Sequence, residues 1–350
     1  MASSLESTLT RAWLHRGPLA LALWPLSLLF RLLAALRLVL FRAGVLKSER
    51  LPVPVIVVGN IFIGGTGKTP LTIWLVGQLR AAGLHPGVIS RGHGGEGESA
   101  PREVLPNANA RDVGDEPLLI ADRTGCPVVV GRRRVEAGRY LLARHPEVDV
   151  LVTDDGLQHY ALRRDVELVL FDGRGVGNGW TLPAGPLREP PSRPRDFTIV
   201  NAPELTPALA AAVTPPVGRR PWQMRLGGAH AQRLADPAQR VPLADLGEMA
   251  NKRIVAAAGI GNPGRFFAML RQAGLDVGEL PLPDHHDFLD DPFADVDADV
   301  ILITEKDAVK CRQIEKINND PRLWVVPVSA QIDAALAAKI VEKCRGCPPA

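Results

Sequence analysis

The chain has 350 residues, of which 46% are hydrophobic and 23% charged, a composition that excludes general disorder and leaves room for two domains. Four cysteines are too few for a disulfide framework, and Cys344 and Cys347 lack the second pair of a zinc site, which indicates a reducing cytoplasm. The formal net charge is +3. Because residues 1–50 hold seven basic and two acidic residues, the remainder is slightly acidic, which excludes a general nucleic-acid surface.

Residues 1–47 form the first predicted segment, a membrane-associated helical one, and its apolar part is residues 17–41. The uncharged run 17–30 is shorter than the roughly 20 residues that span a bilayer. On a continuous helix the basic side chains would fall within an arc of roughly 140°, which is typical of a helix lying in a membrane interface. These side chains are Arg16, Arg31, Arg37 and Arg42. A core helix and a signal peptide are alternatives, and Pro25 leaves one kinked helix or two shorter ones equally open.

Residues 48–205 alternate short apolar runs with helical stretches. The predicted strands are residues 53–58, 87–90, 127–130, 148–153 and 167–171. The predicted helices are residues 71–82, 116–123 and 133–144. Strands that alternate with helices predict a parallel sheet covered on both faces. We therefore expect an α/β/α lobe like that of the P-loop NTPases.

A second, smaller α/β lobe is predicted for residues 253–350, after a partly extended linker at residues 206–252. The linker is rich in proline and alanine. The predicted strands of this lobe are residues 253–258, 300–304 and 324–327, and its helices are residues 262–272 and 334–343. Two lobes joined by a linker would leave a cleft between them, which is a common place for a ligand site.

The segment "VVGNIFIGGTGKTP", residues 57–70, lies between a predicted strand and a predicted helix, where a phosphate-binding loop belongs. Its backbone N–H groups and its lysine suit the phosphates of ATP, and its last threonine suits Mg²⁺. The candidate nucleotide ligands are Gly64, Gly65, Thr66, Gly67, Lys68 and Thr69. Phe62 stands where the usual pattern has its first glycine, so a tight turn with a surface lysine is the alternative.

A second strand ends in two carboxylates, Asp154 and Asp155, within "VDVLVTDDGLQHY". Strand ends of such a sheet point to the nucleotide crevice, so we expect at least one of the two to serve Mg²⁺; use in a turn is the alternative. His159 suits either helix capping or substrate contact. The candidate ligands for an anionic substrate follow other strands and are Arg91, Arg132 and Arg134, although arginines in such runs are as often solvated.

Transfer of phosphate to a hydroxyl also needs a proton acceptor. Asp115 lies at the mouth of a predicted helix, and "LPDHHDF" in the second lobe offers Asp284, His285 and His286. If Asp115 and a histidine come from opposite lobes, they meet only when the cleft closes. A metal site is the alternative for the second cluster.

Eight blocks of sequence, in this order, resemble the tetraacyldisaccharide 4′-kinases of lipid A biosynthesis. They are "VGNIFIGGTGKTP", "SRGHGG", "DVGDEP", "TDDGLQHY", "LPAGPLREP", "AAGIGNPGRFF", "PDHHDF" and "TEKDAVKC". The resemblance covers nearly the whole chain, and the loop of that family has the same phase, so Phe62 is no departure from it.

The resemblance implies a monotopic enzyme at the cytoplasmic face of the inner membrane of Gram-negative bacteria, with an N-terminal membrane helix and two α/β/α lobes joined by a β linker. It implies transfer of the γ-phosphoryl group of ATP to the 4′-hydroxyl of a tetraacylated glucosamine disaccharide 1-phosphate, giving lipid IVA. The implied roles are ATP and Mg²⁺ binding for Lys68 and Thr69, metal binding for Asp154, Asp155 and Glu189, and catalysis by Asp115 with His285 and Lys68.

Two other functions would use the same phosphate loop. One is a membrane-associated P-loop NTPase that drives insertion or partitioning of another protein, and the other is a nucleotide-binding scaffold without turnover. Neither needs a base contributed by the second lobe.

Overall fold

The computed structural model divides the chain into two compact units, each formed by segments that are distant in the sequence. It describes residues 11–92, 100–106, 108–216, 218–248 and 253–346. The first unit comprises Met1–Arg91, Arg133–Arg225 and Ile332–Ala350, and the second comprises Gly92–Arg132 and Leu226–Gln331. Residues 92–132, which lie within the predicted core 48–205, thus belong to the second unit. Residues 332–350, which were predicted as part of the second lobe, belong to the first unit.

The first unit is built on a parallel sheet, as predicted. Its strands are β1 (Val55–Gly59), β2 (Pro86–Ser90), β5 (Val150–Asp154), β6 (Val166–Asp172), β7 (Phe197–Asn201) and β8 (Trp222–Gly227). They lie in the order β8-β7-β6-β1-β5-β2, and all the pairs are parallel. Every residue of β1, β2, β5 and β7 is buried, because a parallel sheet is covered on both faces and its strands are largely apolar.

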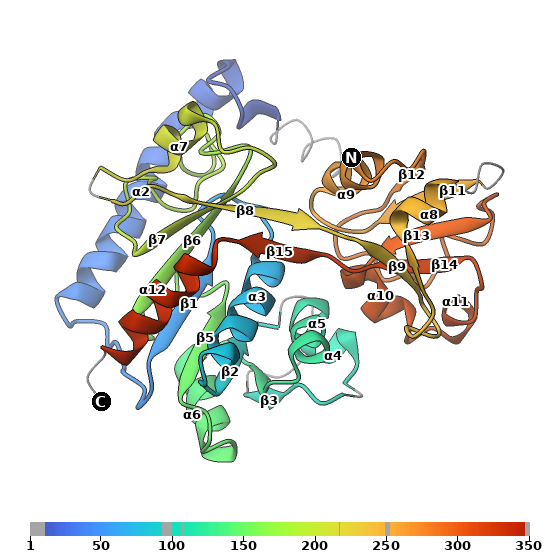
Figure 1. The fold of residues 1–350 in the computed structure, drawn as a ribbon. Helices are drawn as coiled ribbons and strands as arrows, with labels where there is room; N and C mark the ends of the chain where they lie inside the picture. The colour runs from blue at the N-terminus through green and yellow to red at the C-terminus, as the bar shows by residue number, and fades with distance from the viewer. Residues whose placement is uncertain (1–10, 93–99, 107, 217, 249–252, 347–350) are drawn as a thin grey trace. The chain divides into compact units, whose positions relative to one another are not determined.

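Helices flank this sheet. They are α3 (Lys68–Ala81), α6 (Arg134–Arg144), α7 (Pro207–Val213) and α12 (Ala334–Arg345). Figure 1 shows α12, the last helix of the chain, beside α3, with which it is in contact. The buried side chains of α3 include Leu71, Leu75 and Leu79, whose spacing puts them on one face of the helix. The predicted closing helix of the second lobe therefore belongs to the first unit.

Helix α2 (Pro18–Arg42) runs unbroken through Pro25, so of the two alternatives left open by the sequence, one helix is the one observed. Its 25 residues, with a mean hydropathy of 2.0 in the most apolar window, are long and apolar enough to cross a membrane. Its buried side chains are those of Ala20 and Ser27, and most of its leucines are exposed. The core-helix alternative is therefore wrong, since a core helix is mostly buried.

The second unit holds a six-stranded sheet in the order β10-β9-β14-β13-β11-β12. Its strands are β9 (His230–Arg233), β10 (Arg240–Pro242), β11 (Ile254–Ala258), β12 (Gly278–Pro281), β13 (Val300–Thr304) and β14 (Leu323–Val326). The last four pair in parallel, and β9 and β10 add antiparallel strands. The predicted linker 206–252 therefore supplies strands to this sheet as well as joining the lobes.

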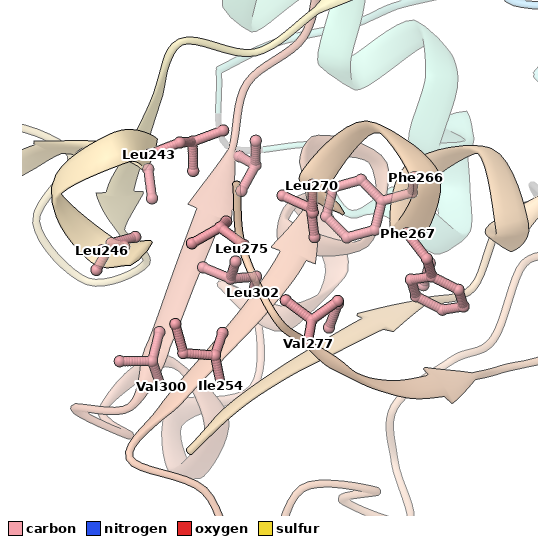
Figure 2. Packing of buried hydrophobic residues seen from close by; sticks show 14 residues of the cluster. Leu243, Leu246, Ile254, Phe266, Phe267, Leu270, Leu275, Val277, Val300 and Leu302 are labelled. Carbon is pink, nitrogen blue, oxygen red and sulfur yellow. The ribbon is translucent and has the colours of Figure 1, made fainter. Parts of the chain in front are cut away.

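Alternation along the central strands divides the core of this sheet into two clusters. Val300 and Leu302 belong to the same cluster as Phe266 and Phe267 of α9 (Pro263–Gln272), and Figure 2 labels these side chains. Ile301, between them in the chain, belongs to the other cluster. Side chains of a strand point alternately to opposite faces, so each face of β13 has its own apolar layer.

Short elements complete the second unit. They are β3 (Arg102–Glu103), β4 (Val128–Val130), α4 (Ala110–Val113), α5 (Asp115–Thr124), α8 (Leu243–Glu248), α10 (Glu305–Cys311) and α11 (Glu315–Asn318). A salt bridge of 2.5 Å joins Arg123 of α5 to Glu305 of α10, and the backbone N–H of Ala110 donates to Gln313 Oε1 (3.2 Å). These contacts tie residues 92–132 to the C-terminal elements. The chain passes between the units four times: within β8, within β15 (Ser329–Ile332), and after Arg91 and Arg132, which lie outside the strands.

Candidate functional site

The phosphate loop of the first unit connects β1 to α3 and is shaped by glycines. Gly64 and Gly67 have φ of +97° and +100°, a backbone region that L-residues rarely adopt. The side chain of Asn60 donates to the carbonyl oxygens of Phe62 (2.6 Å) and Gly64 (3.0 Å) and so braces the loop. Helix α3 begins at Lys68, and Gly67 supplies no capping side chain, which leaves first-turn N–H groups of the kind that bind anions.

Asn201, at the end of β7, supports the loop from the sheet. Its Nδ2 donates to the carbonyl oxygen of Thr66 (2.8 Å), and a Cβ added to Gly67 would lie 2.5 Å from the same nitrogen. Thr66 is fully buried, and its hydroxyl has no hydrogen-bond partner among the described residues. A buried hydroxyl without a partner is costly unless a ligand satisfies it, so this loop fits a phosphate group.

The two carboxylates predicted to bind the metal have different surroundings. Asp155 lies with its Oδ1 3.9 Å from Lys68 Nζ and 3.3 Å from Arg188 Nη1, and its side chain is partly exposed. Burial raises its pKa, but Lys68 and Arg188 outweigh this and lower the pKa below the ordinary value. Asp154 is fully buried and accepts from the hydroxyl of Thr72 (3.4 Å). Of the two, Asp155 presents the more accessible oxygens.

Glu189 is held by three donors. Gln158 Nε2 (2.8 Å) reaches one carboxylate oxygen, and Tyr160 Oη (2.9 Å) and Arg193 Nε (2.6 Å) reach the other. These bonds fix the segment that follows Asp155 in the chain. The metal-binding role of Glu189 stays a prediction, and it would have to coexist with these three donors.

His159 caps helix α6. Its Nε2 accepts from the backbone N–H of Arg134 (3.2 Å) at the start of the helix, which satisfies one of the unpaired N–H groups of the first turn. Burial and nearby arginines lower the pKa of His159 to about 4, so the ring is neutral and can accept. The arginines that contribute are Arg134, Arg37, Arg164 and Arg91. The geometry thus accounts for His159 through capping, and a substrate contact stays a prediction.

Arg134 is the buried member of the predicted anion site. Burial lowers its pKa to about 10, while Asp154 and Asp155 act in the opposite direction, so the guanidinium is charged at neutral pH. Arg91, after β2, contributes to the same electrostatic field. Arg132 belongs to the second unit, so the three predicted substrate arginines do not come from one unit.

Asp115 and His285 are in direct contact in the second unit. His285 Nδ1 lies 3.1 Å from Asp115 Oδ2, and Lys310 Nζ lies 3.3 Å from the same oxygen. Asp115 begins α5 and is 4% exposed, whereas His285 is 38% exposed and has φ of +60°. The expectation that the two meet only on lobe closure is wrong, because both belong to one compact unit.

The groups around this pair lower the pKa of Asp115 and raise the pKa of His285. Burial raises the pKa of Asp115, but the bond from His285 and the charges of Lys306 and Lys310 hold it well below its usual range. The bond to Asp115 raises the pKa of His285, against burial and Lys306. Asp115 is therefore ionised at neutral pH.

The metal alternative does not fit the contacts of Asp284 and His285, but for His286 it stays open, since the ligand atoms of His286, Asp287 and Asp290 lie within 4.8 Å of one another. Lys306 Nζ donates to Asp284 Oδ1 (3.2 Å) and lies 3.4 Å from His285 Nε2, so an ammonium group faces both. His286 Nδ1 instead accepts from the backbone N–H of Phe288 (3.1 Å). Of the two histidines, the structure thus places His285 against Asp115.

Several contacts of the site were missed by the sequence reasoning. Asn60, Arg188 and Asn201 hold the loop and Asp155, and Lys306 and Lys310 surround the pair. The spacing of the two lysines in "TEKDAVKC" is a signal that could have found them, because residues four apart share one face of a helix. His93 to Gly95 of "SRGHGG", and Cys347, lie outside the described residues.

Comparison with known proteins gives one consistent result. A family model described as "Tetraacyldisaccharide-1-P 4'-kinase" matches residues 19–345. A protein named tetraacyldisaccharide 4'-kinase from Herminiimonas arsenicoxydans is 59% identical and one from Janthinobacterium sp. (strain Marseille) is 61% identical, each over 98% of this chain and 97% of the relative. A crystal structure described as the "apo" form of LpxK from Aquifex aeolicus in complex with ATP aligns with a TM-score of 0.74 at 26% identity, over 93% of this chain and 99% of that one.

Proposed function

The chain belongs to the tetraacyldisaccharide-1-phosphate 4′-kinase family, and we propose that it transfers the γ-phosphoryl group of ATP to the 4′-hydroxyl of a tetraacylated glucosamine disaccharide 1-phosphate, giving lipid IVA. The observation that supports hydroxyl transfer most directly is the Asp115–His285 contact of 3.1 Å. A loop that only bound ATP would not need this second group, and one that only hydrolysed ATP would not need a base contributed by the second unit.

The phosphate loop would hold the ATP. The N–H groups at the start of α3 and the ammonium of Lys68 suit the phosphate oxygens, and the partnerless hydroxyl of Thr66 offers a further donor. Thr69 and Asp155 supply the hard oxygen ligands that Mg²⁺ prefers. When bound, Mg²⁺ would neutralise charge on the phosphates. Arg188 and Lys68 hold the Asp155 carboxylate in place.

Asp115 would accept the proton of the sugar hydroxyl. Its low pKa makes it a weak base for a ground-state alcohol, but in phosphoryl transfer the attacking oxygen becomes acidic only as its bond to phosphorus forms. An ionised carboxylate in position is then sufficient. His285 holds the orientation of this carboxylate by donating to Oδ2, while Glu116 N donates to Oδ1 (2.9 Å).

Helix α2 would bring the enzyme to its lipid substrate at the cytoplasmic face of the inner membrane. Its exposed leucines include Leu32 and Leu36, and its length and hydropathy fit a membrane. A substrate with four acyl chains stays in the membrane, because transfer of each CH₂ to water costs about 0.8 kcal/mol. The arginines Arg91 and Arg134 would meet its phosphate.

The test is incubation of the purified protein with γ-labelled ATP and a panel of acylated disaccharide phosphates and water-soluble sugars. We expect label on the disaccharide lipid, at its 4′ position. Label found only in inorganic phosphate would indicate an NTPase, and nucleotide binding without turnover under any acceptor would indicate a scaffold. Either of these results would overturn the proposal.

A further inference from the structure

Lys306, on the first turn of α10, lies against the exposed side of His285. Its side chain is 15% exposed, and its Nζ lies 3.4 Å from Glu116 Oε1, 3.2 Å from Asp284 Oδ1 and 3.4 Å from His285 Nε2. Glu116 and Asp284 balance its charge, and with Asp115 they outweigh the effect of burial, so its pKa is raised. Lys306 is therefore a stable ammonium group in contact with the ring nitrogen that Asp115 leaves free.

The chemistry of the three groups determines where the imidazole proton lies. An ammonium can only donate and an ionised carboxylate can only accept. The contact with Lys306 therefore favours a lone pair on His285 Nε2, and the contact with Asp115 favours the proton on Nδ1. We propose that Lys306 is a positioning residue that opposes protonation of His285 at Nε2 and so favours the neutral ring with its proton on Nδ1, which donates a hydrogen bond to Asp115 without adding a positive charge.

This role rests on the proposed function, in which Asp115 is the proton acceptor. A protonated His285 would place a full positive charge 3.1 Å from Asp115 Oδ2 and make that carboxylate a still weaker base. Loss of the Lys306 charge would favour protonation of His285, with Asp284 Oδ1 only 3.9 Å from Nε2. Charged groups in contact with His285 are Asp115, Asp284 and Lys306, while Glu116 contacts Lys306 and Lys310 contacts Asp115.

The buried carboxylate of Asp307 connects the helix that carries Lys306 to the loop that carries His285. Asp307 Oδ2 accepts from the hydroxyl of Thr304 (2.6 Å), which caps α10, and from the N–H of Gly259 (3.1 Å). The carbonyl oxygen of Gly259 in turn accepts from the N–H of His285 (3.2 Å). Helix α10 and the loop of His285 are thus fixed to the same fully buried group, so the approach of Lys306 to Nε2 is part of the packed structure.

The first test is ¹⁵N-histidine NMR of the full chain, with the His285 resonances assigned by their loss in His285→Gln. In the wild type we expect the neutral ring to carry its proton on Nδ1. In Lys306→Met the midpoint of His285 protonation should move up by about one pH unit. The matched control is Lys316→Met, which removes a lysine that is 75% exposed and should leave the midpoint unchanged.

The second test is the pH profile of kcat/KM. The acid limb of Lys306→Met should move to higher pH by a similar amount, and Lys306→Arg, which keeps the charge, should restore the wild-type limb. Lys306→Gln also removes the charge and replaces Lys306→Met if that variant does not fold. An unchanged His285 midpoint, or a neutral ring with its proton on Nε2, would overturn the role of Lys306. Because the NMR titration needs no turnover, a failure of the kinase assignment would be seen separately, as absence of label transfer in the wild type.

Discussion

Replacement of Gly67 by alanine tests whether the observed loop conformation is the one that binds ATP. Gly67 precedes α3 with φ of +100° and ψ of +31°, and a residue with a side chain is disfavoured there by roughly 1–2 kcal/mol. The new Cβ would also lie 2.5 Å from Asn201 Nδ2 and 3.3 Å from Met224 Cε. The variant must therefore strain the backbone and displace a neighbour.

The expected loss of affinity follows from these two effects. Displacing Asn201 breaks its hydrogen bond to the carbonyl oxygen of Thr66 (2.8 Å), which contributes about 1 kcal/mol. With the backbone strain the total is about 2–3 kcal/mol. If this free-energy cost arises only when the loop adopts the conformation that binds ATP, the Kd for ATP should rise roughly 30- to 150-fold.

Isothermal titration calorimetry with ATP measures this directly. The matched control is Gly77→Ala in the same helix, where the glycine is exposed and the added Cβ meets no described atom within 4 Å. That variant should bind ATP normally and be up to about 1 kcal/mol more stable, since alanine is the better helix former. A Kd for Gly67→Ala within threefold of wild type, in a folded protein, would refute the assignment of this conformation to nucleotide binding.

Three further predictions concern the proton acceptor, the cap of α6 and the membrane helix. Asp115→Asn should lower kcat by roughly 10²- to 10⁴-fold in steady-state assays and leave the Kd for ATP unchanged. The folded pKa of His159, about 4, lies below its ordinary 6.5, so its stabilisation is complete above pH 6.5 and is lost as the pH falls toward 4. Between pH 7 and 5 the wild type should therefore lose about 1 kcal/mol more stability than His159→Gln, measured by urea unfolding. Arg31→Glu with Arg42→Glu should weaken binding to anionic vesicles in sedimentation, most at low salt.

Each of these has a matched control. Asp112→Asn removes an exposed carboxylate and should keep full kcat; equal losses in both variants would contradict the role of Asp115. His85→Gln, which removes an exposed histidine outside the cap, should keep the wild-type pH dependence of stability. If His159→Gln also kept the wild-type pH dependence, the cap would be excluded as its origin. Arg219→Glu with Arg220→Glu reverses two exposed charges in a loop. Unchanged vesicle binding after the reversals in α2 would count against an interfacial helix.

The parts of the fold that local sequence determines were predictable. The parallel sheet follows from short apolar runs between helices, and the loop before Lys68 follows from glycines that need positive φ. Continuity of α2 through Pro25 was not predictable from the segment alone. Proline removes one helical N–H, and whether the helix breaks depends on surrounding contacts such as those of Ser27, which is buried against residues 181 and 184.

The contact of Asp115 with His285 spans 170 residues, and local patterns carry no information about it. The sequence reasoning divided the chain at one linker and so placed Asp115 opposite His285. Long-range contacts such as Arg123 with Glu305 instead assign residues 92–132 to the second unit. Candidate chemistry could thus be identified from residue types, while the partners of each residue required the tertiary structure.

One short segment links α2 to the phosphate loop within the first unit. The hydroxyl of Ser27 in α2 donates to Thr181 O (2.5 Å) and accepts from Ala184 N (3.0 Å). A few residues on, the N–H of Arg188 donates to the carbonyl oxygen of Ile61, beside the loop, and its guanidinium reaches Asp155. Because the bonds of Ser27 are buried and a backbone hydrogen bond continues the connection, the fold itself fixes the distance between α2 and the loop. For a kinase whose acceptor is held in a membrane by its acyl chains, a fixed distance between α2 and the loop is useful. If α2 binds the membrane, ATP bound at the loop is then held at a set distance from the acceptor.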